Sequence, residues 1–243
     1  MRGGRVWILV GAVALLAAGV LMRRGRPAPA PPSHPPSPAA PEVAAGSWRP
    51  YAEGDFQEKL AEVEGGRLRL RASTLGSSDT TVKVLGFRSA VPLRLDRETR
   101  ILADVDWNRQ SNGSYLTAGL VLSPDSADGN PLAAANWLKV EYVGVPPGKN
   151  GRLSVSVRTA GRDRHLFQEG WPTENREGRP LGIQKIELVL KAGGFELIEN
   201  GRSLYSCTEP VLKFTSAHLC LQMTTHSNYP AREVRFDNVR WSE

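Results

Sequence analysis

The stretch RILADVDWNRQ, residues 100 to 110, holds two carboxylates that could do acid chemistry. Asp104 and Asp106 stand two positions apart, and Arg109 follows three positions later. A retaining glycosidase needs two carboxyls about 5 to 5.5 Å apart, one of which can carry a proton. Arg109 cannot be that acid, because a guanidinium stays protonated in proteins. The stretch alone therefore does not predict sugar hydrolysis, and Asp104 with Glu141 stays open as a different acid pair.

The same stretch alternates apolar and polar residues, which is typical of a β-strand with one buried face. The positions predicted to face the core are Ile101, Ala103, Val105 and Trp107. The positions predicted to face outward are Asp104, Asp106 and Asn108. Residues 115–122, 137–143 and 153–158 alternate in the same way. The sequence therefore predicts four consecutive strands that share one polar face.

A ligand is predicted to lie across this shared face. Aromatic rings stack on the C–H faces of sugars, while carboxylates and amides bond sugar hydroxyls. Trp137 is the main evidence for this prediction, because a large aromatic side chain on a solvated face is unusual unless it binds something. An antiparallel sheet with one solvated face gives the same alternation without any ligand, and this alternative stays open. The candidate binding residues are Asp104, Asp106, Asn108, Tyr115, Trp137, Lys139 and Glu141.

Alternating runs continue from about Ser47 to the end of the chain, and helical periodicity is almost absent. The further runs are residues 67–72, 185–191, 195–200, 217–223 and 234–241. Turn signals lie between the runs, namely PPGKNG at 146–151, KAGG at 191–194 and the hairpin dipeptide Asn200-Gly201. About ten strands with hairpin spacing predict an all-β fold, in which two antiparallel sheets pack face to face.

Three parts of the sequence carry a resemblance to a known superfamily. They are YLTAGLVLSP followed by NWLKVEYVGVPPGKNGRLSVSVR, then IELVLKAGGFELIENGRSLYSC, and the closing VRFDNVRW. Together they resemble the concanavalin A-like lectin and glucanase superfamily, in particular its bacterial laminin-G-like and keto-disaccharide-hydrolase-like domains. The resemblance covers about Ser47 to Ser242. It implies a jelly-roll sandwich with one concave sheet, in a superfamily that mostly handles carbohydrate, but a fold alone gives no activity.

The resemblance also bears on catalysis. Family 16 glycoside hydrolases of this superfamily carry the strand motif E-x-D-x-x-E, whose outer glutamates act as nucleophile and general acid. The matching places here are Asp104, Asp106 and Arg109, and the arginine breaks the pattern. We therefore expect a non-catalytic module that binds carbohydrate or another envelope component. A glycoside hydrolase or sugar-modifying enzyme is the alternative.

Residues 1–26 predict a membrane anchor or a signal segment. Val6 to Met22 is apolar and uncharged over roughly 17 residues, which as a helix reaches about 25 Å, the short end of a membrane span. A cleaved secretory signal has the same layout. The RRGR that follows, and the proline after the one A-x-A match, favour an uncleaved anchor. Arginines flank the run on both sides, so charge does not orient it.

Residues 27–45 are rich in proline and alanine, and predict a disordered spacer that would extend about 60 Å as polyproline II. The β-sandwich domain is then residues 46–243. Such a stalk suits a cell envelope, so we expect the domain in the periplasm or outside the cell, with the inner membrane as partner of the N-terminal helix. Nucleic acid is not a predicted partner, because five of the six net positive charges lie within residues 1–26.

Several other residues leave alternatives open. Cys207 and Cys220 could form a disulfide if they lie on neighbouring strands, or remain packed free thiols. His218 shares a strand face with Cys220, but two ligands do not make a zinc site. No cofactor is predicted. Related jelly rolls bind structural calcium near the place of Asp237, and a solvated strand aspartate is the favoured interpretation.

Two loop segments hold aromatic residues with two interpretations each. Trp171, in EGWP, either caps the core or stacks on a sugar. His226, Asn228 and Tyr229, in TTHSNYP, form a polar aromatic loop. For this loop the sequence favours an ordinary surface loop over a binding loop.

Overall fold

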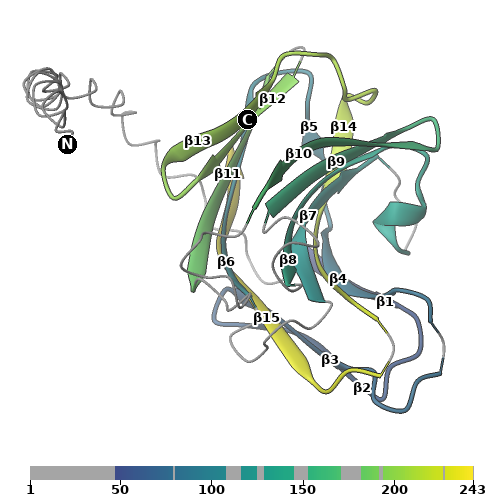
Figure 1. The fold of residues 1–243 in the computed structure, drawn as a ribbon. Coiled ribbons are helices and arrows are strands. Elements are labelled where there is room, and N and C mark those ends of the chain that lie inside the picture. Colours follow the sequence, from purple (N-terminus) through teal and green to yellow (C-terminus); the bar gives the residue numbers. More distant parts are fainter. Residues whose placement is uncertain are drawn as a thin grey trace, which may run out of the picture. The chain divides into compact units, whose positions relative to one another are not determined.

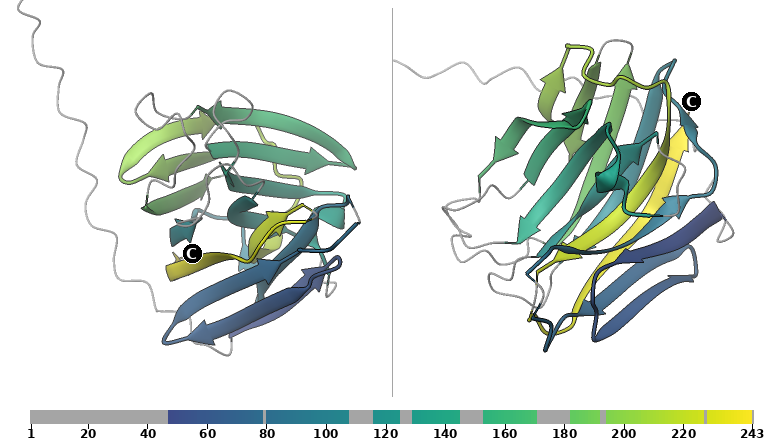
Figure 2. Two further views of the ribbon diagram at one scale, coloured as in Figure 1. Left: turned by 60° about the horizontal axis from the view of Figure 1, so that its bottom comes forward. Right: turned by 90° about the vertical axis from the view of Figure 1, so that its right-hand side faces the viewer.

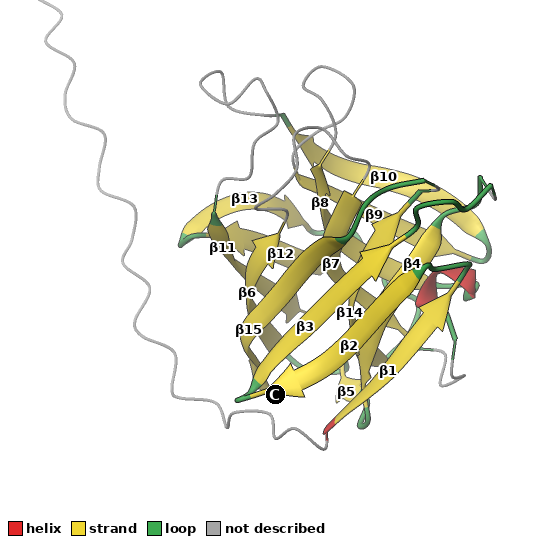
Figure 3. Cartoon of the chain, turned by 90° about the horizontal axis from the view of Figure 1, so that it is seen from below, coloured by secondary structure: helices red, strands yellow, loops and turns green. Residues whose placement is uncertain are grey.

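The structure, a computed structural model, describes residues 47–78, 80–107, 116–124, 129–144, 153–170, 182–191, 194–226 and 228–242. This part of the chain forms fifteen β-strands and the short 3-10 helix η2 (Pro131–Ala133). Figure 3, coloured by secondary structure, shows strands throughout the described part. The prediction of an all-β fold with two antiparallel sheets is confirmed.

One of the two sheets, which we call the front sheet, carries most of the middle of the chain. Its strands in spatial order are β1 (Trp48–Glu53), β4 (Lys83–Ser89), β14 (Ser216–Thr225), β7 (Leu116–Ser123), β8 (Trp137–Gly144), β9 (Leu153–Thr159) and β10 (Arg162–Glu169), and β5 (Leu93–Arg94) pairs with β14. Neighbouring strands of this sheet pair antiparallel. The right-hand view of Figure 2 looks onto this sheet.

The other sheet, the back sheet, has seven strands. In spatial order they are β13 (Arg202–Cys207), β12 (Gly194–Glu199), β11 (Ile183–Lys191), β6 (Thr99–Trp107), β15 (Arg232–Ser242), β3 (Arg67–Ser73) and β2 (Glu58–Glu64). Figure 1 shows the two sheets as nested arcs, with the front sheet on the inner side of the back sheet. The outer face of the front sheet is therefore the concave side of the two arcs.

The core lies between the sheets, where the alternation predicted it. The core positions predicted on β6 are all buried, and so are the alternate apolar positions of β7, β8 and β9, which are Leu116, Ala118, Leu120, Leu122, Leu138, Val140, Tyr142, Leu153, Val155 and Val157. Each valine, leucine or isoleucine among them contributes about 1.5 to 3 kcal/mol through burial. Trp107 of β6 stacks on Tyr142 of β8, with ring centroids 5.2 Å apart, so aromatic packing joins the two sheets.

The Asn200-Gly201 hairpin is also confirmed. It joins β12 to β13, which pair antiparallel. Asn200 has φ of 50° and Gly201 has φ of 80°. Both central residues of a two-residue type I′ turn need positive φ, which asparagine and glycine adopt most readily. The dipeptide therefore fixes the position at which the chain reverses direction between β12 and β13.

One prediction about the sheets is wrong. The strand at 100–108 does not share a face with those at 115–122, 137–143 and 153–158, because β6 belongs to the back sheet and β7, β8 and β9 belong to the front sheet. Alternation tells which residues of one strand share a side. It does not tell which sheet a strand joins when the chain crosses between layers.

The predicted anchor and spacer, residues 1–45, lie outside the described residues. From residue 47 onward, no described helix is long and apolar enough to cross a membrane. The division of the chain into anchor, spacer and domain thus stays a prediction.

Candidate functional site

The structure places the predicted binding residues on opposite surfaces of the sandwich. Trp137, Lys139 and Glu141 point outward from β8 in the front sheet, because Leu138, Val140 and Tyr142 point into the core. Asp104 and Asp106 point outward from β6 in the back sheet, because Ile101, Ala103, Val105 and Trp107 point into the core. The full thickness of the core separates the two groups.

This separation overturns one chemical alternative. Asp104 and Glu141 cannot act as an acid pair, because they lie on opposite outer faces and a retaining pair stands about 5 to 5.5 Å apart. The other two predicted binding residues, Asn108 and Tyr115, lie outside the described residues.

Trp137 is on the predicted face but is not a solvated platform. Only 4% of it is exposed, because the segment around η2 covers it. Its Nε1 donates to the Leu132 carbonyl at 3.3 Å. The cationic groups of Lys139 and Arg158 lie 5.7 and 5.4 Å from its ring centroid. Trp137 therefore anchors the covering segment, and the sequence held no signal that this segment would fold back over β8.

A row of mostly polar positions crosses the outer face of the front sheet. In ladder order the row consists of Tyr51, Gly86, Gln222, Gly119, Glu141, Ser154 and Gln168. Most of its central side chains are buried although they face away from the core. This front row, as we call it, combines a phenol, two amides, a hydroxyl and a carboxylate, which are groups that bond hydroxyls of a ligand.

Tyr51 lies across the front row rather than standing away from it. A Cβ atom at Gly86 would come within 2.6 Å of the Tyr51 hydroxyl oxygen, so glycine is required beneath the ring. The Tyr51 hydroxyl donates to Gln222 Oε1 at 2.9 Å. Burial raises the pKa of Tyr51 well above its ordinary value of 10. The hydroxyl is thus a neutral group held in one position.

Glu141 is the carboxylate at the centre of the front row. Its Oε1 lies 2.6 Å from Lys139 Nζ, and both side chains are sheltered, at 13% and 18% exposure. The residues directly opposite Glu141 on the adjoining strands are Gly119 and Ser154. Among the described residues, its ladder partners and Lys139 therefore supply no second carboxylate beside it.

Further polar groups extend this face towards its β10 edge. The next ladder position holds Ser156 opposite both Lys139 and His165. Ser156 Oγ and His165 Nδ1 are hydrogen-bonded at 2.7 Å. At the edge, Arg158 Nε is 2.5 Å from Asp163 Oδ1. The outer face of the front sheet is therefore polar from β14 to β10, except where η2 covers it.

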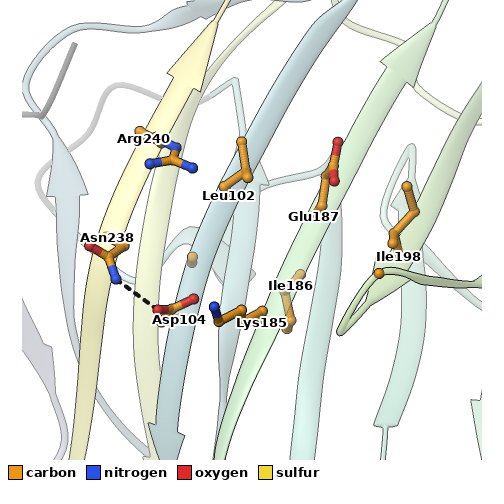
Figure 4. A pocket seen from close by; sticks show the side chains of 10 residues that line it. Leu102, Asp104, Lys185, Ile186, Glu187, Ile198, Asn238 and Arg240 are labelled. Atoms are coloured by element: carbon orange, nitrogen blue, oxygen red, sulfur yellow. Dashed lines mark hydrogen bonds between the residues drawn. The ribbon is translucent and has the colours of Figure 1, made fainter. Parts of the chain in front are cut away.

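The outer face of the back sheet carries the other half of the predicted site. Asp104 lines a pocket of about 390 Å³ over β6, β11 and β15, which Figure 4 shows with Lys185, Glu187 and Arg240. Asn238, whose φ of 51° marks a register shift in β15, donates to Asp104 Oδ2 at 2.8 Å. Charged side chains line the pocket, and its two acids, Asp104 and Glu187, already accept hydrogen bonds from Asn238 and Arg100.

Ion pairs also lie on the part of the back face formed by β2, β3 and β15. Arg67 pairs with Asp237 at 2.7 Å, and Arg69 pairs with Glu62 and Glu233 at 2.8 Å each. Asp237 is therefore the ion-pair partner of an arginine on the adjacent strand. These side chains are partly or fully solvated, as expected for a polar outer face.

The remaining candidate residues have structural roles. Cys207 lies in the back sheet and Cys220 in the front sheet, and both are free and buried, so the disulfide alternative is wrong. His218 Nδ1 is hydrogen-bonded to the Ser89 carbonyl at 2.8 Å. In the described part, no group of three or more His, Cys, Asp or Glu residues could hold a metal ion.

The TTHSNYP loop is tied to the turn after β3. Thr74 Oγ1 donates to the His226 carbonyl at 2.7 Å and accepts from the Tyr229 backbone N–H at 3.0 Å. Asn228 Oδ1 accepts from the Gly76 backbone N–H at 3.3 Å. These contacts fit the favoured interpretation, a surface loop. Trp171 lies outside the described residues.

Known structures share this arrangement of strands. A β-1,3-1,4-glucanase (lichenase) from a mouse hindgut metagenome matches with TM-score 0.55 and 9% identity, over 82% of this chain and 94% of that one. A Bacillus licheniformis β-glucanase matches with TM-score 0.54 and 11% identity, over 83% and 94%. The carbohydrate-binding module CBM66 from Bacillus subtilis matches with TM-score 0.50 and 11% identity, over 81% and 96%.

The fold is the concanavalin A-like jelly roll. The resemblance seen in the sequence is thereby confirmed at the level of fold. No family model matches the sequence, and no curated protein matches it. At identities this low, the concanavalin A-like fold is what the likeness establishes, and the chemistry must come from the chain's own residues.

Sequence reasoning missed the residues of the front row that come from β1, β4 and β14. Tyr51 and Gly86 belong to strands that showed no alternation, and all seven residues of β4 are buried. Gln222 sits in a predicted strand, but its neighbours on the sheet were unknown. A glycine inside a strand marks a close approach by another group, but the sequence predicted neither the strand around Gly86 nor its burial.

Proposed function

We propose that this chain is a non-catalytic carbohydrate-binding module, and that its ligand lies on the outer face of the front sheet. The observation that carries the proposal is the front row, in which neutral hydrogen-bonding groups and one carboxylate are sheltered from solvent without being part of the core. Sheltered polar groups on an outer face are costly unless something bonds them. Sugars offer the many hydroxyls that such a surface requires.

The comparisons support carbohydrate as the class of ligand. One neighbour is named as a carbohydrate-binding module, and two are named as glucanases. The absence of a carboxylate directly opposite Glu141 in the described ladder favours binding over retaining hydrolysis. Tethering by residues 6–22, and a place in the periplasm or outside the cell, complete the proposal and rest on the sequence alone.

A glycan array probed with the full chain tests the proposal. We expect binding to one group of related glycans, and loss of that binding in Gln222→Ala, which removes an amide from the front row. Asn238→Ala is the matched control, because it removes an amide from the back face. Release of reducing sugar from the bound glycan would instead identify a glycoside hydrolase, and an array without any bound glycan would contradict the proposal.

A further inference from the structure

Arg88 stands out among the charged residues of the front sheet. It points outward from β4 and is only 5% exposed. Its Nη2 donates to the Gly129 carbonyl at 3.1 Å, and its guanidinium carbon lies 6.0 Å from the centroid of the Tyr51 ring. Its Nε and Nη1 have no hydrogen-bond partner. Three N–H groups of a buried cation are thus left unused.

The described residues that pair with Arg88 across the sheet do not supply a counter-charge. The residues opposite it on the adjoining strands are Arg49 and Cys220. Burial raises the pKa of the Cys220 thiol to about 11, so this neighbour is neutral at physiological pH. Two other cations on the same face do have a carboxylate, since Lys139 pairs with Glu141 and Arg158 with Asp163.

A buried guanidinium without an anion is unfavourable, because it has lost water and gained little in return. A guanidinium does not lose its proton to escape this penalty. Its planar N–H groups match the two oxygens of a carboxylate. Nε and Nη1 are themselves shielded from solvent, so an anionic ligand group would reach these donors by displacing the groups that cover them.

We infer that Arg88 recognises a carboxylate on the ligand, and that the saccharide bound by the front sheet is acidic, of the uronic-acid type. That the ligand is a saccharide rests on the proposed function, and that the saccharide is acidic rests on Arg88. Arg88 lies two residues from Gly86 on the same side of β4, beside Tyr51 and Gln222. A sugar carboxylate at Arg88 would thus place the ring hydroxyls near the front row.

The experiment compares binding of the full chain and of Arg88→Met to matched glycans. The probes are oligogalacturonates, alginate oligomers and glucuronate-containing glycans, each beside its neutral methyl-ester form, with sulfated and neutral glycans on the same array. We expect binding to at least one acidic glycan and not to its methyl ester. We expect Arg88→Met to weaken that binding about 30-fold or more, as for loss of one partner of a buried charge pair. Arg100→Met is the matched control, since Arg100 pairs with Glu187 on the back face.

The melting temperature of Arg88→Met and the NMR signal of the Arg88 side chain are measured as well. Arg88→Met should melt at the same temperature as the parent or higher, because it removes an unpaired buried charge; a lower melting temperature would mean that Arg88 is structural. The Arg88 Nε–H signal in NMR should shift with glucuronate and not with glucose, and the absence of this shift would overturn the inference even if no array glycan binds.

On the array, equal binding of the ester and acid forms would contradict an acidic ligand and leave the proposed function standing. Binding of sulfated glycans alone would replace carboxylate by sulfate and also contradict the inference. An array without any bound glycan would count against the proposed function.

Discussion

On the back sheet, Arg67, Arg69 and Arg71 stand on one face of β3, and each reaches a carboxylate on an adjacent strand, with side chains 28% to 51% exposed. On the front sheet, outward-facing groups such as Arg88 and Gln222 are only 5% and 3% exposed. Both faces are polar in sequence. The back face neutralises its own charges in water, whereas the front face holds sheltered polar groups, one of them a guanidinium whose Nε and Nη1 have no hydrogen-bond partner.

This difference separates two reasons for a polar outer face. A solvated face needs only to avoid aggregation and repulsion, and exposed cross-strand ion pairs achieve that at little gain in stability. A sheltered polar face carries a desolvation penalty, which natural proteins tolerate where a ligand is bound. Four variants or conditions test this comparison, and they follow in decreasing order of expected effect.

The largest effect is expected from Trp137→Ala on the front sheet. Trp137 is 4% exposed and packs with Val121, Ala134 and Cys220, so its removal leaves a cavity under η2. The free energy of unfolding should fall by about 3 to 5 kcal/mol, measured by urea denaturation. Ile183→Ala on the back sheet is the control, because Ile183 is 52% exposed and its loss should change little. Equal effects of the two variants would mean that η2 does not cover Trp137.

Gly86→Ala should have the next largest effect. The added Cβ would lie 2.6 Å from the Tyr51 hydroxyl oxygen and 2.7 Å from the Leu221 carbonyl oxygen. Tyr51 would have to leave Gln222, at a cost of about 1 to 3 kcal/mol. Gly170→Ala, where an added Cβ meets nothing within 4 Å, is the control in the same melting experiment. An unchanged melting temperature for Gly86→Ala would show that Tyr51 is not held across the row.

The Cys220 thiol of the front sheet should make the free energy of unfolding depend on pH. Burial raises its folded-state pKa from 9.0 to about 11, with Arg88 opposing the shift. An unfolded chain releases this proton first as pH rises, so the contribution to stability is complete below pH 9 and is lost between about 9 and about 11. The free energy of unfolding should therefore fall by about 1 to 3 kcal/mol more in the parent than in Cys220→Ala over that range. Parallel pH profiles would contradict a sheltered thiol on this face.

The smallest effect is expected from Arg67→Ala on the back sheet. The pair with Asp237 is exposed, at 51% and 36%, and such pairs contribute little. Thermal melts of parent and variant should nearly coincide, and should converge further at high salt because exposed charges are screened. A clear drop in melting temperature would show that the back face is not merely solvated.

The sequence predicted the strands that alternate and failed on those that do not. Runs such as residues 100–107 and 217–223 became β6 and β14 because one face of each is apolar. The strand β4 was missed because both of its faces are buried, and β10 because RDRHLFQE is largely polar. The hairpin turn at Asn200-Gly201 could be predicted because its type depends on two neighbouring residues only.

The site was predictable in part for the same reason. Alternation correctly placed Lys139 and Glu141 on an outward face. It could not place Asp104 in the other sheet, or bring Tyr51 across Gly86 to Gln222, because those contacts join residues far apart in the chain. The burial of Trp137 depends on a covering segment whose packing no local pattern specifies.

Titration calorimetry of two matched variants, with the glycan selected by the array, tests most directly whether the front face is the binding face. Glu141→Gln alters the front row and Glu187→Gln alters the back-sheet pocket, and each variant replaces one ion-paired carboxylate by an amide. We expect Glu141→Gln to weaken binding about tenfold or more while Glu187→Gln binds as the parent does. Weaker binding in Glu187→Gln, with Glu141→Gln unchanged, would move the site to the back sheet and contradict the account.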